Sequence, residues 1–213
     1  MFADRRDAGR RLAEKLVHYK GRTGVLVLAL PRGGVVTGFE IARSLDAPLD
    51  VLIVRKMGFP GQPELALGAI SETGAVVLNE QVISYGRLPK EYIEYEKSRQ
   101  REEINRRITL YRGGNPLEKL EGKIIILADD GVATGSTMKA AIVTLREERI
   151  ERLVVAVPVS PPETAEELGA MADEFVCLST PFAFMAVGSY YEDFSQVTDE
   201  EVAEILRMQT PEE

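Results

Sequence analysis

The segment that most constrains the fold is IIILADDGVATGST, at residues 124–137. Its first five residues are apolar, which is typical of a parallel strand buried on both faces of its sheet. Two aspartates follow, and then a stretch rich in glycine and hydroxyl side chains leads into a helical pattern. Ligands of open α/β sheets bind beyond the carboxyl ends of the strands. The segment therefore predicts an α/β fold with a binding site at the polar end of this strand.

Apolar runs alternate with helical patterns along the rest of the chain. We predict parallel strands at residues 25–30, 49–54, 123–128, 153–157 and 175–178. We predict helices at residues 4–19, 35–45, 89–111, 136–147, 162–170 and 199–208, short strands at 69–71 and 75–78, and a mobile loop at 58–68. Strands that alternate with helices indicate a parallel sheet in a Rossmann-like α/β fold. Because no linker separates two cores, we expect a single domain over residues 1–213.

Composition narrows the classes of function. The net charge of the 213 residues is −8, and such an acidic surface repels nucleic-acid phosphates. No apolar run approaches the roughly 18 residues of a membrane span, and the first residues lack a signal-peptide pattern, so we expect a cytoplasmic protein with a small-molecule substrate. One cysteine and one histidine exclude an internal disulfide, a zinc site and a cysteine–histidine pair. The chemistry must therefore use carboxylates, cations, backbone amides and, where a metal is needed, magnesium.

The polar end of the central strand suits a phosphorylated sugar. A phosphate needs backbone N–H groups at the start of a helix, where the helix dipole favours negative charge. The glycines and hydroxyls of residues 131–137 supply such a cup. Asp129 and Asp130 stand just before it, and carboxylates accept hydrogen bonds from sugar hydroxyls. Acids for the hydroxyls and a loop for the phosphate together indicate a ribose 5-phosphate site.

Other interpretations of these residues are weaker. Paired aspartates also end the Mg-binding strand of nucleotide hydrolases, but that class needs a GxxxxGK(S/T) loop, which the sequence lacks. A phosphatase or kinase-like protein would need a phosphate-binding lysine beside the acids. The stretch GGVVTG at residues 33–38 only loosely resembles the dinucleotide fingerprint GxGxxG. An ordinary strand-to-helix turn seldom combines an apolar strand, two acids and TGST.

ILADDGVATGST resembles the phosphoribosyl diphosphate signature of the type I phosphoribosyltransferases, in which an apolar strand, two acids and a variable stretch precede TGxT. The resemblance implies the fold of that family, with a C-terminal hood and, here, a long inserted helix. It also implies that Asp129 and Asp130 hold the ribose 2- and 3-hydroxyls and act in catalysis. The implied 5-phosphate loop consists of Gly131, Val132, Ala133, Thr134, Gly135, Ser136 and Thr137.

Two further sequences match positions where this family binds the diphosphate. The PRGG turn after the first strand would bring Arg32 and Gly33 to it, although PRGG alone would be an ordinary glycine turn. Arg55 and Lys56, after the second strand, would stabilise the leaving group, with Lys56 as a catalytic residue. A pair of surface cations is otherwise simply solvated.

Two loops match the mobile parts of the family. The loop at residues 58–68 resembles the flexible catalytic loop that excludes water, and Glu64 within it is equally well a ligand contact or a solvated acid. The stretch STPFAFMAVGSYYEDF, residues 179–194, falls where the family has its hood. Phe182 or Phe184 could stack there on a flat acceptor ring, whereas clustered aromatic residues are more often plain core.

The resemblance implies transfer of a 5-phosphoribosyl group from 5-phosphoribosyl 1-diphosphate to a nitrogenous acceptor, with release of pyrophosphate. Magnesium would bind through this substrate, with Asp129 and Asp130 as the candidate protein ligands. Hypoxanthine–guanine enzymes carry an aspartate immediately before the TG of the signature, where this chain has Ala133, so the acceptor stays open. The competing class is a non-catalytic phosphoribosyl-diphosphate-binding regulatory protein, which would need a DNA-binding module or a basic face.

The predicted helix at residues 89–111 stands apart from this chemistry. Its centre, EKSRQREE, offers almost no apolar stripe. We therefore expect the helix to project from the core. It is then either solvated or in contact with another subunit of a homo-oligomer.

Overall fold

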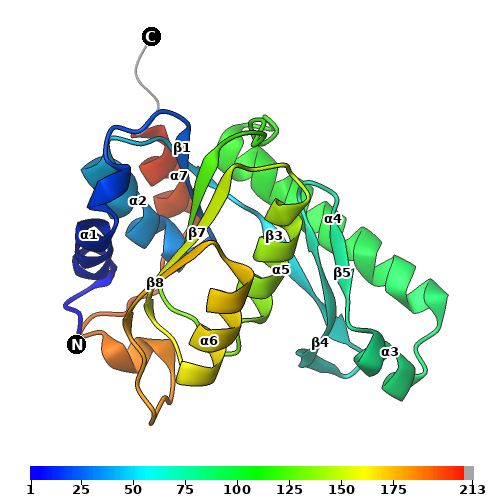
Figure 1. Cartoon of the computed structure of the whole chain (residues 1–213). Helices are drawn as coiled ribbons and strands as arrows, with labels where there is room; N and C mark the ends of the chain where they lie inside the picture. The colour runs from blue at the N-terminus through cyan, green and yellow to red at the C-terminus, as the bar shows by residue number, and fades with distance from the viewer. Residues whose placement is uncertain (209–213) are drawn as a thin grey trace.

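The central layer of the molecule is a five-stranded parallel sheet, shown in Figure 1 for the computed structural model, which describes residues 1–208 apart from the side chains of Pro63 and Glu64. The strands are β1 (Val25–Ala29), β2 (Leu49–Val51), β6 (Ile124–Ala128), β7 (Arg152–Val159) and β8 (Glu174–Ser179). They lie in the order β2-β1-β6-β7-β8, and all neighbouring pairs are parallel. The predicted parallel-sheet α/β fold is confirmed.

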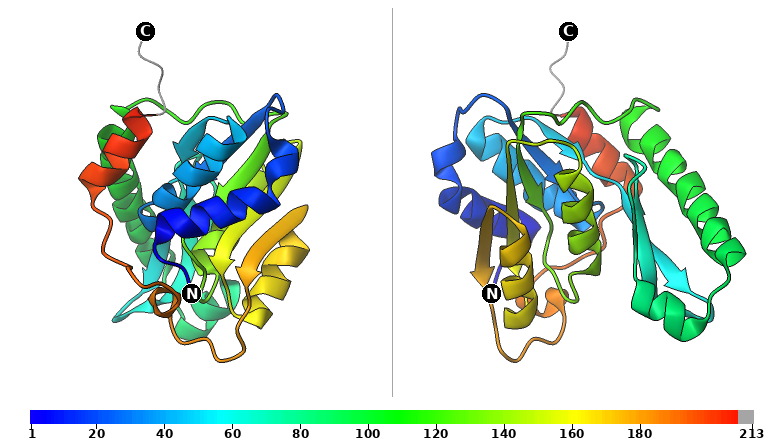
Figure 2. Two further views of the ribbon diagram at one scale, coloured as in Figure 1. Left: turned by 90° about the vertical axis from the view of Figure 1, so that its left-hand side faces the viewer. Right: turned by 45° about the vertical axis from the view of Figure 1, so that its right-hand side comes forward.

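Helices cover both faces of this sheet (Figure 2). One face packs against α1 (Arg5–Lys15), α2 (Gly33–Leu45) and α7 (Asp199–Arg207), and the other against α5 (Ser136–Arg146) and α6 (Pro162–Met171). Short 3-10 helices follow α1, at η1 (Val17–Tyr19), and precede α7, at η2 (Val187–Tyr190). Val25 and Val27 of β1 enter the first core, whereas Leu26 and Leu28 enter the second, because successive strand residues alternate between faces. Burial on both faces explains the continuous apolar runs in the sequence.

A second sheet of three antiparallel strands forms, with two helices, an arm at residues 54–112 (Figure 1). The arm consists of β3 (Val54–Phe59), β4 (Gln62–Ser71), β5 (Val76–Leu78), α3 (Glu80–Gly86) and α4 (Lys90–Arg112). The prediction of a loop at residues 58–68 is wrong, because β3 and β4 pair there as a hairpin. Two of its glycines occupy irregular positions of the hairpin, since Gly61 has φ 71° at the turn and the strand register shifts at Gly58. The side chain of Glu64, a predicted ligand contact, lies outside the described residues.

Helix α4 confirms the long helix predicted there, and it extends along the arm away from the central sheet (Figure 1), but one of its faces is buried against β3, β4 and α7. Its buried residues are Ile93, Glu96, Gln100, Ile104 and Tyr111. Two of these five are polar, so the stripe is invisible in the sequence. Both have partners, since Arg99 donates two hydrogen bonds to Glu96 and Arg55 donates one to Gln100. Neither α4 nor any other helix within residues 1–208 is long and apolar enough to cross a membrane.

Candidate active site

The loop between β6 and α5 surrounds a cavity of about 130 Å³, which we call the phosphate cup. The residues that line it are Asp129, Gly131, Val132, Ala133, Thr134, Gly135, Ser136, Thr137 and Met138. Of the residues predicted to hold the ribose 5-phosphate, all except Asp130 therefore line one space. The cup lies beyond the carboxyl end of β6, where open α/β sheets bind ligands.

Two glycines with positive φ shape the cup. Gly135, with φ 74°, is the N-terminal cap of α5, so the unpaired N–H groups of the first helical turn face the cup. Gly131 has φ 147°, and a Cβ there would approach Val187 to 2.5 Å. Thr164 of α6 donates a hydrogen bond of 3.0 Å to the carbonyl oxygen of Ala133, which ties the loop to the neighbouring helix. A helix N-terminus framed in this way suits a phosphate group.

Asp129 and Asp130 directly follow β6, and the two acids have different neighbours. Asp129 opens onto the cup but is otherwise enclosed, and its Oδ1 accepts a hydrogen bond of 2.8 Å from the N–H of Asp130. Burial, followed by the charge of Asp130, raises the pKa of Asp129 well above its usual value. Burial also raises the pKa of Asp130, but the hydrogen bond and charge of Arg5 oppose that shift. Both carboxylates are therefore stabilised in their charged form by any cation or donor that a ligand brings.

The partner of Asp130 is Arg5 at the start of α1, a residue that sequence analysis did not single out. Arg5 Nε donates to Asp130 Oδ2 at 2.6 Å, and the two side chains are only 11% and 16% exposed. The residues are 125 positions apart, so no local pattern links them. One signal was present: Arg5 and Arg6 occupy the first turn of a helix, where positive charge opposes the helix dipole. A cation in such a position indicates an interaction elsewhere that holds it.

The PRGG turn after β1 packs against the same two acids. Arg32 caps the N-terminus of α2, and the peptide bond that precedes it is cis. A side chain at Gly33 would collide with Asp130 Oδ2, and a Cβ at Gly34 would lie 2.9 Å from Asp129 Oδ1. The turn predicted to hold the diphosphate thus adjoins the acids predicted to hold the ribose, and only glycine permits so close an approach.

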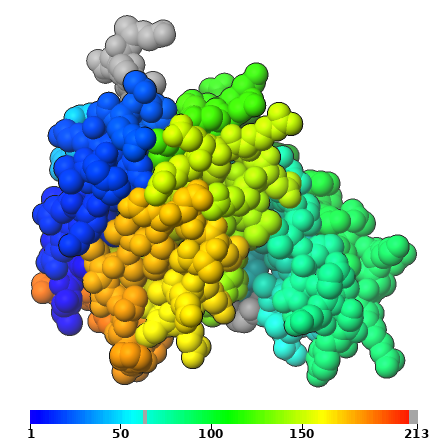
Figure 3. All heavy atoms as spheres, viewed as in Figure 1, coloured from blue at the N-terminus to red at the C-terminus, as the bar shows by residue number. Residues whose placement is uncertain are grey.

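Arg55 and Lys56 lie on opposite faces of β3, because consecutive strand residues alternate. Lys56 lines a cavity of about 510 Å³ between the arm and α5, together with Ser136 of the cup. Figure 3 shows the surface hollowed between the arm and the neighbouring helices. Arg55 instead donates a 3.1 Å hydrogen bond to Gln100 of α4, and burial, with the charge of Arg107, lowers its pKa. The structure therefore brings Lys56 to the cup side of β3 and Arg55 to the other.

The two predicted acceptor-stacking residues do not line the phosphate cup. Phe182 is 98% exposed, and Phe184 stacks on Tyr190 with 5.5 Å between ring centroids. The aromatic residue that contacts the acids is instead Tyr191, whose hydroxyl donates a 2.5 Å hydrogen bond to the carbonyl oxygen of Asp130. The acceptor role of the two phenylalanines stays a prediction.

The donor set of the site suits a metal that arrives with its ligand. Among the described residues, no group of three or more histidine, cysteine, aspartate or glutamate side chains is arranged to hold a metal ion. Asp129 and Asp130 remain as a pair, and each has a pKa raised by burial. Magnesium bound to substrate phosphates takes only one or two protein carboxylates. The residues present therefore fit a magnesium ion carried by a phosphorylated ligand.

The family model described as the phosphoribosyl transferase domain matches residues 3–193. The chain belongs to this family. Two Mycobacterium tuberculosis proteins, from the strains CDC 1551 and H37Rv and each provisionally named a phosphoribosyl transferase, are 46% identical to it over 206 residues. The match covers 97% of this chain but 46% of each relative, so the chain spans about half of their length.

Two solved structures resemble this chain in fold. The TT1426 protein of Thermus thermophilus has a TM-score of 0.85 at 48% identity, over 98% of this chain and 99% of that one. The AQ2163 protein of Aquifex aeolicus has a TM-score of 0.51 at 12% identity, over 83% and 74% of the two chains, which is a likeness of fold alone. The family match and the parallel sheet confirm the resemblance to type I phosphoribosyltransferases.

Proposed function

We propose that this phosphoribosyl transferase moves a 5-phosphoribosyl group from 5-phosphoribosyl 1-diphosphate to a nitrogen atom of an acceptor base. The observation that carries the proposal is the phosphate cup, where Asp129 and the N-terminus of α5 border one cavity. In the reaction the C1–O bond to the diphosphate breaks and a C1–N bond forms. Pyrophosphate leaves, and the acceptor nitrogen loses its proton.

In this proposal the cup holds the 5-phosphate, and Asp129 and Asp130 hold the ribose hydroxyls. The N–H groups and hydroxyls of residues 131–137 would donate to the phosphate oxygens. Positive charge develops on the ribose as its C1–O bond breaks, and two carboxylates beside the sugar stabilise that charge. The raised pKa values of both acids support this role, because burial makes their charged form costly and a developing positive charge offsets that cost.

The diphosphate would lie between the PRGG turn and β3. Gly33 and Gly34 of this turn adjoin the ribose acids, and Lys56 lines the cavity that shares Ser136 with the cup. Lys56 would therefore stabilise the negative charge of the leaving group. Arg55, which was predicted to act with it, would first have to leave Gln100. We propose that Arg55 supports the packing of α4 instead.

We propose that Mg²⁺ enters with the substrate and is held on the protein side by Asp129 and Asp130. When bound, it supplies Lewis-acid stabilisation of the diphosphate and orients its oxygens. The part played by the chain is to hold the sugar and phosphate rigidly, because correct positioning accounts for much of the rate of such transfers.

The acceptor is not a purine held as in the hypoxanthine–guanine enzymes, since Ala133 stands in the position of their aspartate. Its carbonyl oxygen is already bonded to Thr164, so this residue supports the loop. Phe182, which is exposed, and Phe184 are the candidate surfaces for stacking on a flat acceptor.

The test is to incubate the protein with 5-phosphoribosyl 1-diphosphate, Mg²⁺ and a panel of purine and pyrimidine bases, and to follow pyrophosphate release. Release that depends on one of the bases supports the proposal. The control is the Asp129→Asn, Asp130→Asn double variant. It should bind 5-phosphoribosyl 1-diphosphate about a hundredfold more weakly, because charge-assisted hydrogen bonds contribute about 1.5–3 kcal/mol each. Unchanged binding would show that the acids do not hold the ribose.

The second candidate is a non-catalytic regulatory protein that binds 5-phosphoribosyl 1-diphosphate. It is favoured by Phe182 and Phe184, neither of which lines the cup. Tight binding without turnover on any base would support it, and absence of binding would contradict both candidates. The single domain over residues 1–213, the cytoplasmic location and the homo-oligomer stay predictions under either function.

A further inference from the structure

We propose that Arg5 is a positioning residue of the donor site, that is, the site that binds the phosphoribosyl donor. Arg5 holds the Asp130 carboxylate in the orientation that accepts a ribose hydroxyl. The inference rests on the proposed function, because it concerns the same ribose site. Arg5 lies on α1, far outside the signature segment at residues 124–137. The donor site would thus depend on a residue that its own motif does not contain.

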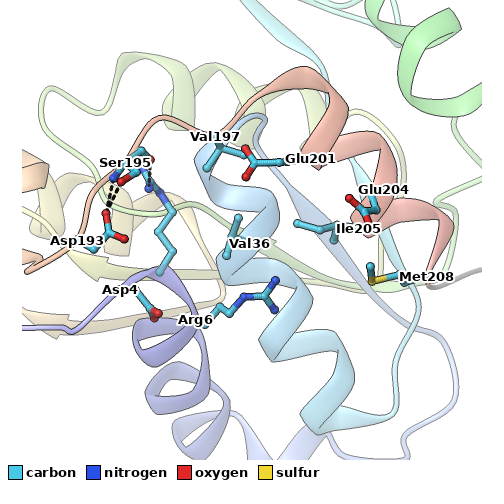
Figure 4. Close-up of a pocket in the computed structure, with 11 residues that line it drawn as sticks. Asp4, Arg6, Val36, Asp193, Ser195, Val197, Glu201, Glu204, Ile205 and Met208 are labelled. Atoms are coloured by element: carbon cyan, nitrogen blue, oxygen red, sulfur yellow. Dashed lines mark hydrogen bonds between the residues drawn. The ribbon is translucent and has the colours of Figure 1, made fainter.

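The guanidinium of Arg5 is held at three points. Nε donates to Asp130 Oδ2 at 2.6 Å, and Nη1 donates to the backbone carbonyl of Ser195 at 2.8 Å. The group also lies over the ring of Phe194, 3.7 Å from the centroid. Figure 4 shows Ser195 and Asp193 on the segment that leads to α7, close to the start of α1. Because Arg5 is only 9% exposed, these protein contacts determine its orientation.

The segment that holds Arg5 is itself fastened to Asp130. Backbone hydrogen bonds join Phe2 to Tyr190 and Glu192, at 2.8 and 2.9 Å. Between these two residues lies Tyr191, whose hydroxyl donates to the carbonyl oxygen of Asp130 at 2.5 Å. Two residues therefore fix Asp130: Arg5 binds its carboxylate, and Tyr191 binds its backbone carbonyl.

Asp130 has little freedom to choose another orientation. Gly33 packs against Oδ2 so closely that a methyl side chain there would collide with it. An enclosed carboxylate without a cationic partner is costly, and the neighbouring charge of Asp129 adds repulsion. A guanidinium is a planar donor of permanent charge, so it can hold one carboxylate oxygen at a defined angle. Since Arg5 takes Oδ2, we assign the other oxygen, Oδ1, to the ribose hydroxyl.

Arg5 acts through Asp130 rather than on the ligand. It is not among the residues that line the phosphate cup. It borders a different cavity, of about 300 Å³, among α1, α2 and α7, with Val36 and Ile205 on the opposite walls (Figure 4). Its effect should therefore be confined to ligands that carry the ribose hydroxyls.

The experiment compares two probes, ribose 5-phosphate and inorganic phosphate, by titration calorimetry. Arg5→Ala should weaken ribose 5-phosphate binding about ten- to hundredfold, the range for residues that orient ligand-binding side chains at metal sites. Inorganic phosphate, which needs only the cup, should bind as before. Arg5→Lys keeps the charge but not the planar fork, so it should restore part of the affinity. Arg11→Ala is the matched control, because Arg11 of the same helix pairs with Asp7 instead, at 2.8 Å.

Equal loss of both probes would show a general structural role and overturn the inference. So would unchanged affinity, or tighter binding of ribose 5-phosphate, which would mean that Arg5 competes with the sugar. A double-mutant cycle gives a second test, since Arg5→Ala should cause no further loss in an Asp130→Ala background. If the wild-type protein binds inorganic phosphate but not ribose 5-phosphate, the proposed function itself fails, and this inference fails with it.

Discussion

The phosphate cup and the arm show two ways in which consecutive residues are used. In the cup, residues 131–137 all line one cavity, because a strand end, a tight loop and a helix start wrap the backbone around a single space. In the arm, adjacent Arg55 and Lys56 face opposite sides of β3, one toward α4 and the other toward the cavity beside α5. Sequence neighbours therefore share a site where the backbone turns, but they diverge along a strand.

The largest expected difference between the two regions concerns their left-handed glycines. Gly135 has φ 74°, and a Cβ there would lie 2.9 Å from Cγ2 of Thr164. Gly135→Ala should therefore displace the N–H groups at the start of α5. We expect ribose 5-phosphate affinity to fall at least about tenfold, since a hydrogen bond to a charged group contributes about 1.5–3 kcal/mol. Titration calorimetry measures the change.

Gly113→Ala is the matched variant at the end of the arm, directly after α4. Gly113 caps the C-terminus of α4 with φ 60°, and nothing lies within 4 Å of the position of its Cβ. Left-handed backbone costs alanine about 1–2 kcal/mol, so the free energy of unfolding should fall by about that amount while binding is unchanged. Similar losses of affinity in both variants would contradict the prediction that the glycine of the cup affects binding and the glycine after α4 affects only stability.

The next largest effect separates the two cations of β3. Lys56→Met should weaken 5-phosphoribosyl 1-diphosphate binding about tenfold, as expected when one hydrogen bond to a charged group is lost. Arg55→Met should leave binding unchanged and lower only the free energy of unfolding, because its partner Gln100 belongs to α4. Equal losses of affinity would mean that Arg55 leaves Gln100 to reach the diphosphate, as the sequence predicts.

The smallest effects are changes in the free energy of unfolding at two enclosed carboxylates, Asp129 beside another acid and Glu96 beside an arginine. Asp129 has a pKa raised by burial and by Asp130, so the folded protein binds this proton more tightly than the unfolded chain does. Its contribution to stability is present below the ordinary value near 3.8 and is lost as the pH rises through the raised value. Asp129→Asn should therefore raise the urea midpoint at neutral pH, and the gain should vanish in acid.

Glu96 of the arm should show the opposite sign. Its side chain is 4% exposed and accepts two hydrogen bonds from Arg99, at 2.7 and 2.6 Å. Glu96→Gln should lower the free energy of unfolding by about 1 kcal/mol, a modest value because the arginine is largely exposed. If Asp129→Asn also destabilised the protein at neutral pH, the buried charge of Asp129 would not lower the stability of the fold, and this prediction would be wrong.

The parts of the fold that the sequence predicts well are those with local causes. The parallel strands are visible because burial on both faces demands uninterrupted apolar runs, and the cup is visible because its glycines and hydroxyls are contiguous. The hairpin of β3 and β4 was missed because pairing between strands outweighs a composition rich in glycine and proline. The buried face of α4 was missed because Glu96 and Gln100 occupy it with partners supplied by Arg99 and Arg55.

The sequence by itself determined the class of the fold and the phosphate cup, since strand burial, positive φ and a helix start all depend on neighbouring residues. The tertiary structure alone decided which side chains accompany the cup. It brings Arg5 to Asp130 across 125 positions, separates Arg55 from Lys56 and sets Gly33 against the second acid. These pairings arise from the packing of α1, α2 and β3 around the sheet, and contacts between distant elements leave no periodic mark in a sequence.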